Sequence, residues 1–233
     1  MIDWCAIDTV LLDMDGTLLD LHFDSHFWLE HLPRRYVELH QLDEATQDVV
    51  RARIIREQGS LNWYSLAYWS RELDVDVPAL KREVQHLIGL RNDSLDFLEW
   101  LKNAHPRVVL ATNADRESLA LKLPLTGLDQ YVDAIVSSED VGAPKEEQSF
   151  WVSLQEIEPF DPQRTLFIDD NAAVLESARR FGIRHLLGIK QPDSTRPEKV
   201  IDSFSVVDRF AALLPQQSVI EKRHKTRLGG ASE

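Results

Sequence analysis

Two carboxylates close a short run of aliphatic residues near the start of the chain. Val10, Leu11 and Leu12 precede Asp13, and Asp15 follows two positions later. A short apolar run of this kind is typical of a buried strand, and ligands of open α/β sheets bind beyond the carboxyl ends of strands. Residues two apart in an extended segment share a face, so both carboxylates can point into one site. Two anions this close favour a divalent cation between them or a raised pKa on one of them.

Three further groups of polar residues follow expected strands or begin an expected helix. Thr112 and Asn113 follow a second apolar run, Lys145 is expected to open a helix, and Asp169 and Asp170 follow another apolar run. Each group alone is more often a helix cap or a solvated charge, because Asp, Thr and Asn are common caps and lysines are mostly exposed. Together, however, they read in chain order as acid pair, hydroxyl, cation and acid pair, which points to one common site.

These groups resemble the four motifs of the haloacid dehalogenase superfamily of phosphatases. The matching segments are Asp-Met-Asp-Gly-Thr at 13–17, Ala-Thr-Asn at 111–113, Ala-Pro-Lys at 143–145 and Ile-Asp-Asp-Asn at 168–171. One such motif is weak, whereas four in the expected order are specific. A helical insert directly after the first motif also resembles the cap domain of that family.

The resemblance implies a two-step phosphoryl transfer. Asp13 is then the nucleophile that attacks phosphorus and forms an aspartyl-phosphate. Asp15 is the general acid that protonates the leaving alkoxide, and later the base that activates water. Thr112, Asn113 and Lys145 are expected to bind the transferring phosphoryl group, because prearranged donors stabilise the charge that develops there.

Mg²⁺ is the cofactor that the resemblance implies. A phosphate dianion repels an incoming carboxylate, and magnesium takes the hard oxygen ligands that carboxylates offer. The matching ligands are Asp13, the backbone carbonyl of Asp15 and Asp169, with Asp170 ordering a metal-bound water. Family members that cleave carbon–halogen bonds lack the second aspartate, because their leaving group needs no proton. The presence of Asp15 therefore favours phosphoryl transfer.

The expected fold class is α/β, with a Rossmann-like parallel sheet core and an inserted helical cap domain. Strands are expected at 8–13, 108–111, 134–136, 165–168 and 185–189, alternating with helical patterns. Between the first two strands, apolar stripes around 49–55, 66–73 and 80–88 have helical spacing, and a last helix is expected over 206–214. The predicted domains are a hydrolase core at 1–20 and 91–217, a cap at 21–90 and a polar tail at 218–233.

The cap carries aromatic and basic residues that are candidates for recognising the leaving group. The main candidates are His22, His26, Trp28, Arg34 and Arg35, and the same region also contains Asp24, Trp63, Tyr64 and Trp69. Aromatic faces can hold a nucleobase by stacking, although most cap tryptophans are expected in the core because large aromatics bury readily. The pattern Leu-Leu-Asp-Leu-His-Phe-Asp at 18–24 resembles bacterial purine 5′-nucleotidases that act on GMP and IMP, and Gly-Ala-Pro-Lys-Glu-Glu at 142–147 is similar too.

Three alternatives are weighed against a purine nucleoside 5′-monophosphate phosphatase. A sugar-phosphate phosphatase or phosphomutase of the same superfamily shares the core chemistry and stays open. A phosphonate-cleaving member needs a cap lysine for a Schiff base, and Lys81 is the only lysine between Asp20 and Trp100, so this interpretation is disfavoured. A non-catalytic magnesium-binding interaction module is the alternative from another class, and the intact acids at every motif argue against it.

The composition limits the partners of the protein. Its 39 acidic and 26 basic residues give a net charge of −13, which argues against a general nucleic-acid binder because such a protein needs a basic face. No apolar run approaches membrane-spanning length, and the single cysteine, Cys5, cannot form an intramolecular disulfide. We therefore expect a cytoplasmic enzyme acting on a small phosphorylated metabolite, with no membrane or nucleic-acid polymer as partner. The oligomeric state stays open.

Overall fold

A parallel β-sheet forms the centre of the computed structural model, which describes residues 2–104, 106–199 and 201–215. The strands are β1 (Thr9–Leu12), β2 (Arg107–Thr112), β3 (Ala134–Ser137), β4 (Thr165–Asp169), β5 (His185–Ile189) and β6 (Val206–Val207). Their order across the six-stranded sheet is β3–β2–β1–β4–β5–β6. The five strands expected from the apolar runs are present, and the predicted α/β class with a Rossmann-like sheet is confirmed.

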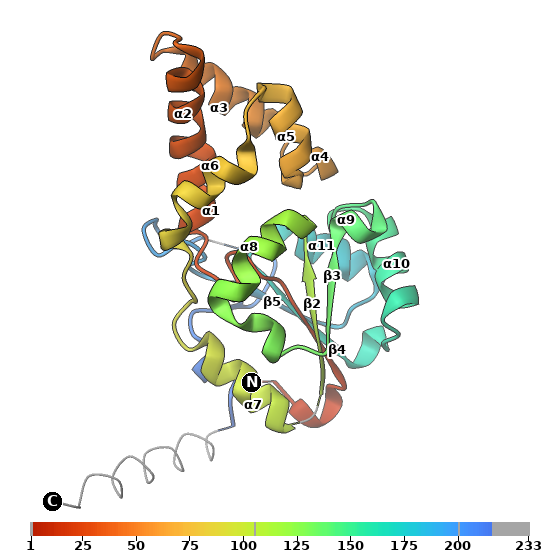
Figure 1. The fold of residues 1–233 in the computed structure, drawn as a ribbon. Helices are drawn as coiled ribbons and strands as arrows, with labels where there is room; N and C mark the ends of the chain where they lie inside the picture. The colour runs from red at the N-terminus through yellow and green to blue at the C-terminus, as the bar shows by residue number, and fades with distance from the viewer. Residues whose placement is uncertain (1, 105, 200, 216–233) are drawn as a thin grey trace, which may run out of the picture.

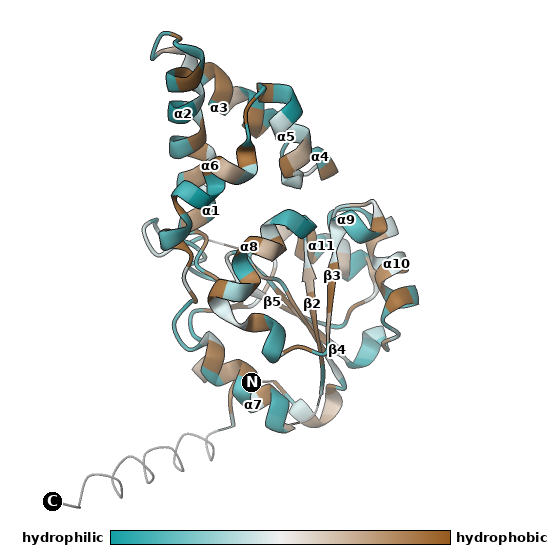
Figure 2. Cartoon of the chain, in the orientation of Figure 1, coloured by the Kyte–Doolittle hydropathy of each residue, from teal (hydrophilic) through white to brown (hydrophobic). Residues whose placement is uncertain are grey.

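The sheet carries a hydrophobic layer on each face, because neighbouring residues of a strand point to opposite sides. Val10 and Leu12 of β1 pack into one cluster, and Leu11 packs into another. Helices α7 (Ser94–Ala104) and α8 (Arg116–Thr126) contribute to the first cluster, and α10 (Gln148–Ile157) and α11 (Ala172–Phe181) contribute to the second. Figure 2 shows strands that are hydrophobic along most of their length, as expected for a parallel sheet covered on both faces.

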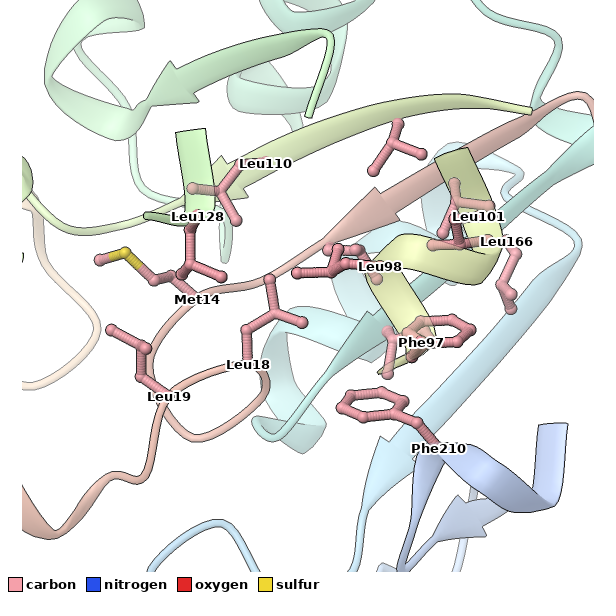
Figure 3. Packing of buried hydrophobic residues seen from close by; sticks show 14 of the residues in the cluster. Met14, Leu18, Leu19, Phe97, Leu98, Leu101, Leu110, Leu128, Leu166 and Phe210 are labelled. Atoms are coloured by element: carbon pink, nitrogen blue, oxygen red, sulfur yellow. The ribbon is translucent and has the colours of Figure 1, made fainter. Parts of the chain in front are cut away.

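The first hydrophobic cluster anchors the loop that carries the acid pair. Met14, Leu18 and Leu19 belong to this loop, and all three buried side chains lie in the cluster to which helix α7 contributes. Figure 3 shows them in one cluster with Phe97 of α7 and Phe210, whose rings stack with centroids 4.6 Å apart. The apolar residues of the loop thus fix the backbone from which Asp13 and Asp15 project.

A second group of helices lies between β1 and α7 in the chain. It comprises α1 (His22–His26), a π-helix (Phe27–His31), α2 (Leu32–His40), α3 (Thr46–Arg56), α4 (Leu61–Tyr64), α5 (Leu66–Leu73), α6 (Val77–Glu83) and a 3₁₀ turn (Gln85–Leu87). Figure 1 shows these helices beyond the carboxyl end of the sheet. They share a hydrophobic cluster of their own, which includes Phe27, Ile54 and Trp69. Among the described residues, no helix is both long and apolar enough to cross a membrane.

Two paired segments connect these helices to the sheet. The amide of Asp20 donates to the carbonyl of Gly89 at 2.9 Å, and the amide of Arg91 donates to the carbonyl of Leu18 at 2.9 Å. The helical insert therefore begins and ends at one place on the sheet. The exact division into a core at 1–20 and 91–217 and a cap at 21–90 stays a prediction, and we use the two names for these ranges.

Two expectations about helices are wrong. Residues 206–214 form β6 and a 3₁₀ turn (Phe210–Leu213) instead of one helix, because β6 pairs with the edge of β5. Gly188 of β5 permits this pairing, since a Cβ there would lie 3.1 Å from Val206 Cγ1. Helix α10 begins at Gln148, so Lys145 lies in the loop before it. The predicted tail at 218–233 lies outside the described residues.

Candidate active site

The four motifs meet at the carboxyl edge of the central strands. Strand β1 lies between β2 and β4, so the chain adds strands first on one side of β1 and then on the other. An open parallel sheet leaves a crevice at the carboxyl ends of the strands where the strand order reverses like this. Asp13 directly follows β1, Thr112 ends β2 and Asp169 ends β4. A cavity of about 470 Å³ lies at this edge. The cap residues that line this cavity include Asp24, Trp28, Gln58, Trp63, Tyr64 and Lys81.

Lys145 is the cation between the two acidic motifs. Its Nζ donates to Asp13 Oδ1 at 2.5 Å, to Asp169 Oδ2 at 2.7 Å and to the carbonyl of Ala111 at 3.1 Å. The side chain is 2% exposed, so these contacts take up the three protons of an ammonium that water hardly reaches. Burial lowers the pKa of Lys145, but the charges of Asp13 and Asp169 outweigh it and raise the pKa. The lysine therefore stays charged.

The second motif holds the loop that carries this lysine. Asn113 Oδ1 accepts from the backbone amide of Lys145 at 2.9 Å, and Asn113 Nδ2 donates to Glu146 Oε2 at 3.0 Å. Thr112 Oγ1 accepts from the amide of Ala114 at 3.0 Å, which leaves its own hydroxyl proton for another acceptor. The Asn113 side chain thus positions Lys145, and contact of Thr112 or Asn113 with a phosphoryl group stays a prediction.

Three carboxylates form a cluster that suits a divalent cation. Asp13, Asp169 and Asp170 each offer one oxygen, and these oxygens lie within 4.8 Å of one another. Asp13 Oδ2 is buried without a hydrogen-bond partner among the described residues, a costly state for a carboxylate oxygen. Burial raises the pKa of Asp13 and raises that of Asp169 well above its usual range, although Lys145 opposes both shifts. A hard cation that binds oxygen, such as Mg²⁺, fits this donor set.

Asp15 contacts a second buried lysine, which the motifs do not include. Lys122 Nζ lies 2.7 Å from Asp15 Oδ1 and 2.6 Å from Asp24 Oδ2, and Lys81 Nζ lies 3.0 Å from Asp24 Oδ1. Burial raises the pKa of Asp15 to about 7, Lys122 lowers it in part, and Asp24 raises it further. These four charges join helix α8 of the core to α1 and α6 of the cap.

One of the five residues expected to recognise the leaving group, Trp28, lines the cavity. The other four contact residues elsewhere: Arg34 pairs with Glu38, Arg35 with Glu38 and Glu83, His26 with Glu30, and His22 contacts Thr195. Recognition by these four stays a prediction that the lining of the cavity does not support. Trp63 and Tyr64, two of the aromatic cap residues noted from the sequence, line the cavity as well. Gln58 also lines it, and the sequence did not single it out because it is neither aromatic nor basic and matches no motif.

Gly16 allows the first motif to lie against the fourth. Its φ is +85°, and a Cβ there would lie 2.8 Å from Asp170 Cγ. We expect Gly16→Ala to lower the free energy of unfolding more than Gly59→Ala, whose φ is +86° but whose Cβ would meet nothing within 4 Å. Both variants lose about 1–2 kcal/mol to the left-handed conformation, and overpacking adds about 1–3 kcal/mol at Gly16 alone. Urea unfolding measures both, and equal losses would contradict the close packing of Gly16 on Asp170.

Known proteins resemble this chain in both sequence and fold. Residues 7–182 match the family model of the haloacid dehalogenase-like hydrolases. The GMP/IMP nucleotidase YrfG of Escherichia coli K12 is 40% identical over 215 residues, which cover 92% of this chain and 97% of YrfG. A phosphorylated carbohydrates phosphatase of Thermotoga maritima is 22% identical over 188 residues, 78% of this chain and 85% of that protein. The crystal structure of a phosphatase of this superfamily from Thermococcus onnurineus superposes with a TM-score of 0.72 at 20% identity, covering 92% and 98% of the two chains.

Proposed function

Because the chain belongs to the haloacid dehalogenase-like hydrolase family, we propose that this phosphatase hydrolyses purine nucleoside 5′-monophosphates such as GMP and IMP. The observation that carries the proposal is the 40% identity to the GMP/IMP nucleotidase YrfG, which extends over 97% of that protein. Trp28 and Trp63 line the same cavity as Asp13, which supports a nucleobase ligand. A base stacked on an aromatic ring gains about 1–3 kcal/mol.

Asp13 is the nucleophile in the proposed reaction. Its carboxylate attacks phosphorus, the bond from phosphorus to the nucleoside 5′ oxygen breaks, and an aspartyl-phosphate forms. Asp15 donates a proton to the departing oxygen and, once ionised, takes a proton from the water that hydrolyses the aspartyl-phosphate. The pKa of Asp15, which burial raises to about 7, supports this assignment because both roles are then accessible near neutral pH.

In this proposal Thr112 donates its hydroxyl proton to a transferring phosphoryl oxygen, and Lys145 exchanges one of its three protein contacts for another phosphoryl oxygen. The Lys145 ammonium lies 2.5 Å from Asp13 Oδ1, so its charge stands beside the carboxylate that attacks phosphorus. Such preorganised donors typically contribute about 3–4 kcal/mol each to the stabilisation of the transition state. Asn113 contributes its backbone amide and keeps the Lys145 loop in place through its side chain.

Mg²⁺ is the proposed cofactor, which Asp13, Asp169 and the backbone carbonyl of Asp15 would hold, with Asp170 ordering a metal-bound water. When bound, it supplies positive charge that reduces the repulsion between a carboxylate and a phosphate dianion. Two observations support the assignment: the three carboxylate oxygens within 4.8 Å of one another and the unpartnered Oδ2 of Asp13. The residues present therefore fit the ion.

A sugar-phosphate phosphatase is the second candidate function. It is favoured by the similarity to the phosphorylated carbohydrates phosphatase of Thermotoga maritima, which covers 78% of this chain at 22% identity. The two candidates share the proposed chemistry at Asp13 and differ in the leaving group that the cap receives. A direct comparison of substrates separates them.

A substrate panel tests the proposed function. We expect kcat/KM for GMP and IMP to exceed that for AMP and for hexose 6-phosphates by at least about 10-fold, because the 6-oxo group accepts a hydrogen bond where adenine has an amino donor. Lys81 and Gln58 line the cavity and can donate to that oxygen. The measurement is phosphate release with Mg²⁺, with EDTA as the metal-free control. A hexose phosphate as the best substrate would favour the second candidate, and no release from any phosphomonoester would contradict both.

A further inference from the structure

We infer that Lys122 is a positioning residue for Asp15, and that Asp24 and Lys81 of the cap hold Lys122 in the required place. The inference rests on the proposed function, in which Asp15 is the general acid. It adds that the orientation of this acid depends on a contact between the cap and the core. Each step follows from the contacts of the four charged side chains.

Lys122 has one well-defined place for its ammonium. The side chain is 1% exposed, so its charge must be compensated by protein groups instead of water. Asp15 Oδ1 at 2.7 Å and Asp24 Oδ2 at 2.6 Å provide this compensation from two sides. Burial lowers the pKa of Lys122, but these two carboxylates outweigh it and raise the pKa, so the ammonium stays charged.

Asp24 is itself fixed by the cap and by helix α8. Its Oδ1 lies 3.0 Å from Lys81 Nζ of helix α6, and Lys81 Nζ donates to Ser118 Oγ at 3.3 Å. Ser118 lies one turn before Lys122 on α8, so the contacts close a ring from α8 through α6 and α1 back to α8. The Phe23 ring lies 5.4 Å from Lys81 Nζ and 5.3 Å from Lys122 Nζ, which adds a cation–π contact to each lysine.

The ion pair with Lys122 determines which oxygen of Asp15 is free to act. Asp15 Oδ1 is buried, whereas the side chain as a whole is 20% exposed and lines the cavity, so Oδ2 is the oxygen open to the substrate. The ammonium beside Oδ1 disfavours a proton on that atom, and a proton held by Asp15 therefore sits on Oδ2. When the bond from phosphorus to the ester oxygen breaks, this proton passes to the leaving oxygen and Asp15 is left as a carboxylate.

The cap is part of this arrangement because it contributes half of the network. Asp24 and Lys81 belong to the cap range 21–90, whereas Asp15 and Lys122 belong to the core. Two further contacts hold the cap in place beside the site. Leu66 of the cap donates its amide to Asp115 Oδ2 at 2.6 Å, and Tyr64 donates its hydroxyl to Glu146 Oε1 at 2.8 Å. The acid is thus held when the cap sits on the core.

A comparison of two substrates with different leaving groups tests whether Lys122 positions the acid or has only a structural role. An alkyl ester such as GMP releases an alkoxide that needs a proton, whereas p-nitrophenyl phosphate releases a stable phenolate. We measure kcat/KM, which reports the first phosphoryl transfer and not the later hydrolysis of the aspartyl-phosphate. For Lys122→Met we expect a loss of about 100-fold or more with the best alkyl substrate of the panel, and less than about 3-fold with p-nitrophenyl phosphate.

Three companion variants complete the design. Asp24→Asn keeps the shape of the side chain and is expected to show the same substrate selectivity with a smaller loss of kcat/KM. It replaces Lys122→Met as the test variant if Lys122→Met does not fold. Lys102→Met removes an exposed lysine of α7 and is expected to leave kcat/KM unchanged for both substrates. Asp15→Asn is the reference for loss of the acid, and we expect it to show the full selective pattern.

The outcomes separate the inference from the proposed function. Equal losses on both substrates for Lys122→Met and Asp24→Asn, beside a selective Asp15→Asn, would overturn the positioning role and leave the proposed function intact. An unselective Asp15→Asn would remove the general acid, and the inference would fall with it. Selective losses in all three variants support the network as the device that orients Asp15.

Discussion

Asp13→Asn is expected to abolish turnover, lowering kcat by at least about 10,000-fold for every phosphomonoester substrate, as removal of a nucleophile does elsewhere. The amide of asparagine has nearly the shape of the carboxylate but carries no charge and is a poor nucleophile. Asp13 Oδ1 accepts from Lys145 at 2.5 Å, which orients the carboxylate at the edge of the sheet and leaves the buried Oδ2 without a partner among the described residues. The measurement is phosphate release with Mg²⁺ and the best substrate of the panel.

The same variant tests the covalent intermediate. After acid quenching of a reaction with ³²P-labelled substrate, we expect label on the wild-type protein and none on Asp13→Asn. Asp8→Asn is the matched control, because Asp8 lies five residues earlier and pairs with Arg164 on the surface. Turnover by Asp13→Asn within 10-fold of the wild type would remove Asp13 as the nucleophile and with it the proposed mechanism.

The sheet and the acid motifs could be predicted from sequence because local patterns encode them. An apolar run such as 165–168 specifies a buried strand, and the polar residue that ends it lies at the carboxyl edge whatever the rest of the chain does. This reasoning predicts Asp13, Thr112 and Asp169 at the carboxyl edge, and all three lie there. The parallel order of the strands then brings them together without any further information.

Contacts between distant residues could not be predicted in this way. Lys122 meets Asp24 across 98 positions of sequence, and both carry charges that are solvated in most proteins. Only the packing of the cap on α8 shows that Lys122 is buried. The start of α10 at Gln148 cannot be predicted for a related reason, because the loop before it is held by Asn113, which accepts from the amide of Lys145. A local pattern contains no sign of such a contact.

Lys145→Met is expected to lower both activity and stability, because one ammonium serves both. Its three hydrogen bonds reach Asp13, Asp169 and the carbonyl of Ala111. We expect kcat/KM to fall by roughly 100- to 1,000-fold, the usual cost of removing one preorganised donor from a transition state. In EDTA, the free energy of unfolding should fall by about 3–5 kcal/mol, because removal of one partner leaves buried carboxylates uncompensated.

Mg²⁺ should restore part of the lost stability. Oxygens of Asp13, Asp169 and Asp170 lie within 4.8 Å of one another, and without Lys145 only Lys199, which lies 2.7 Å from Asp170 Oδ2, offsets their mutual repulsion among the described residues. A ligand that binds the folded state stabilises it in proportion to the logarithm of its concentration over Kd. The variant gains more from a cation than the wild type does, so its urea midpoint should rise further on addition of MgCl₂. Addition of CaCl₂ instead of MgCl₂ tests whether any divalent charge restores the stability of the variant.

Lys102→Met is the control for this series, because an exposed lysine of α7 should change stability by less than about 0.5 kcal/mol. If Lys145→Met has the same urea midpoint of unfolding in EDTA as the wild type, the ammonium does not compensate the carboxylates. The assignment of Lys145 as the central cation then fails. If Mg²⁺ stabilises neither the variant nor the wild type, the three carboxylates do not form a cation site, and if it stabilises both equally, Lys145 does not compete with the ion for them. Both results are independent of turnover, so they test the charge arrangement even where the substrate of the enzyme differs from the one proposed.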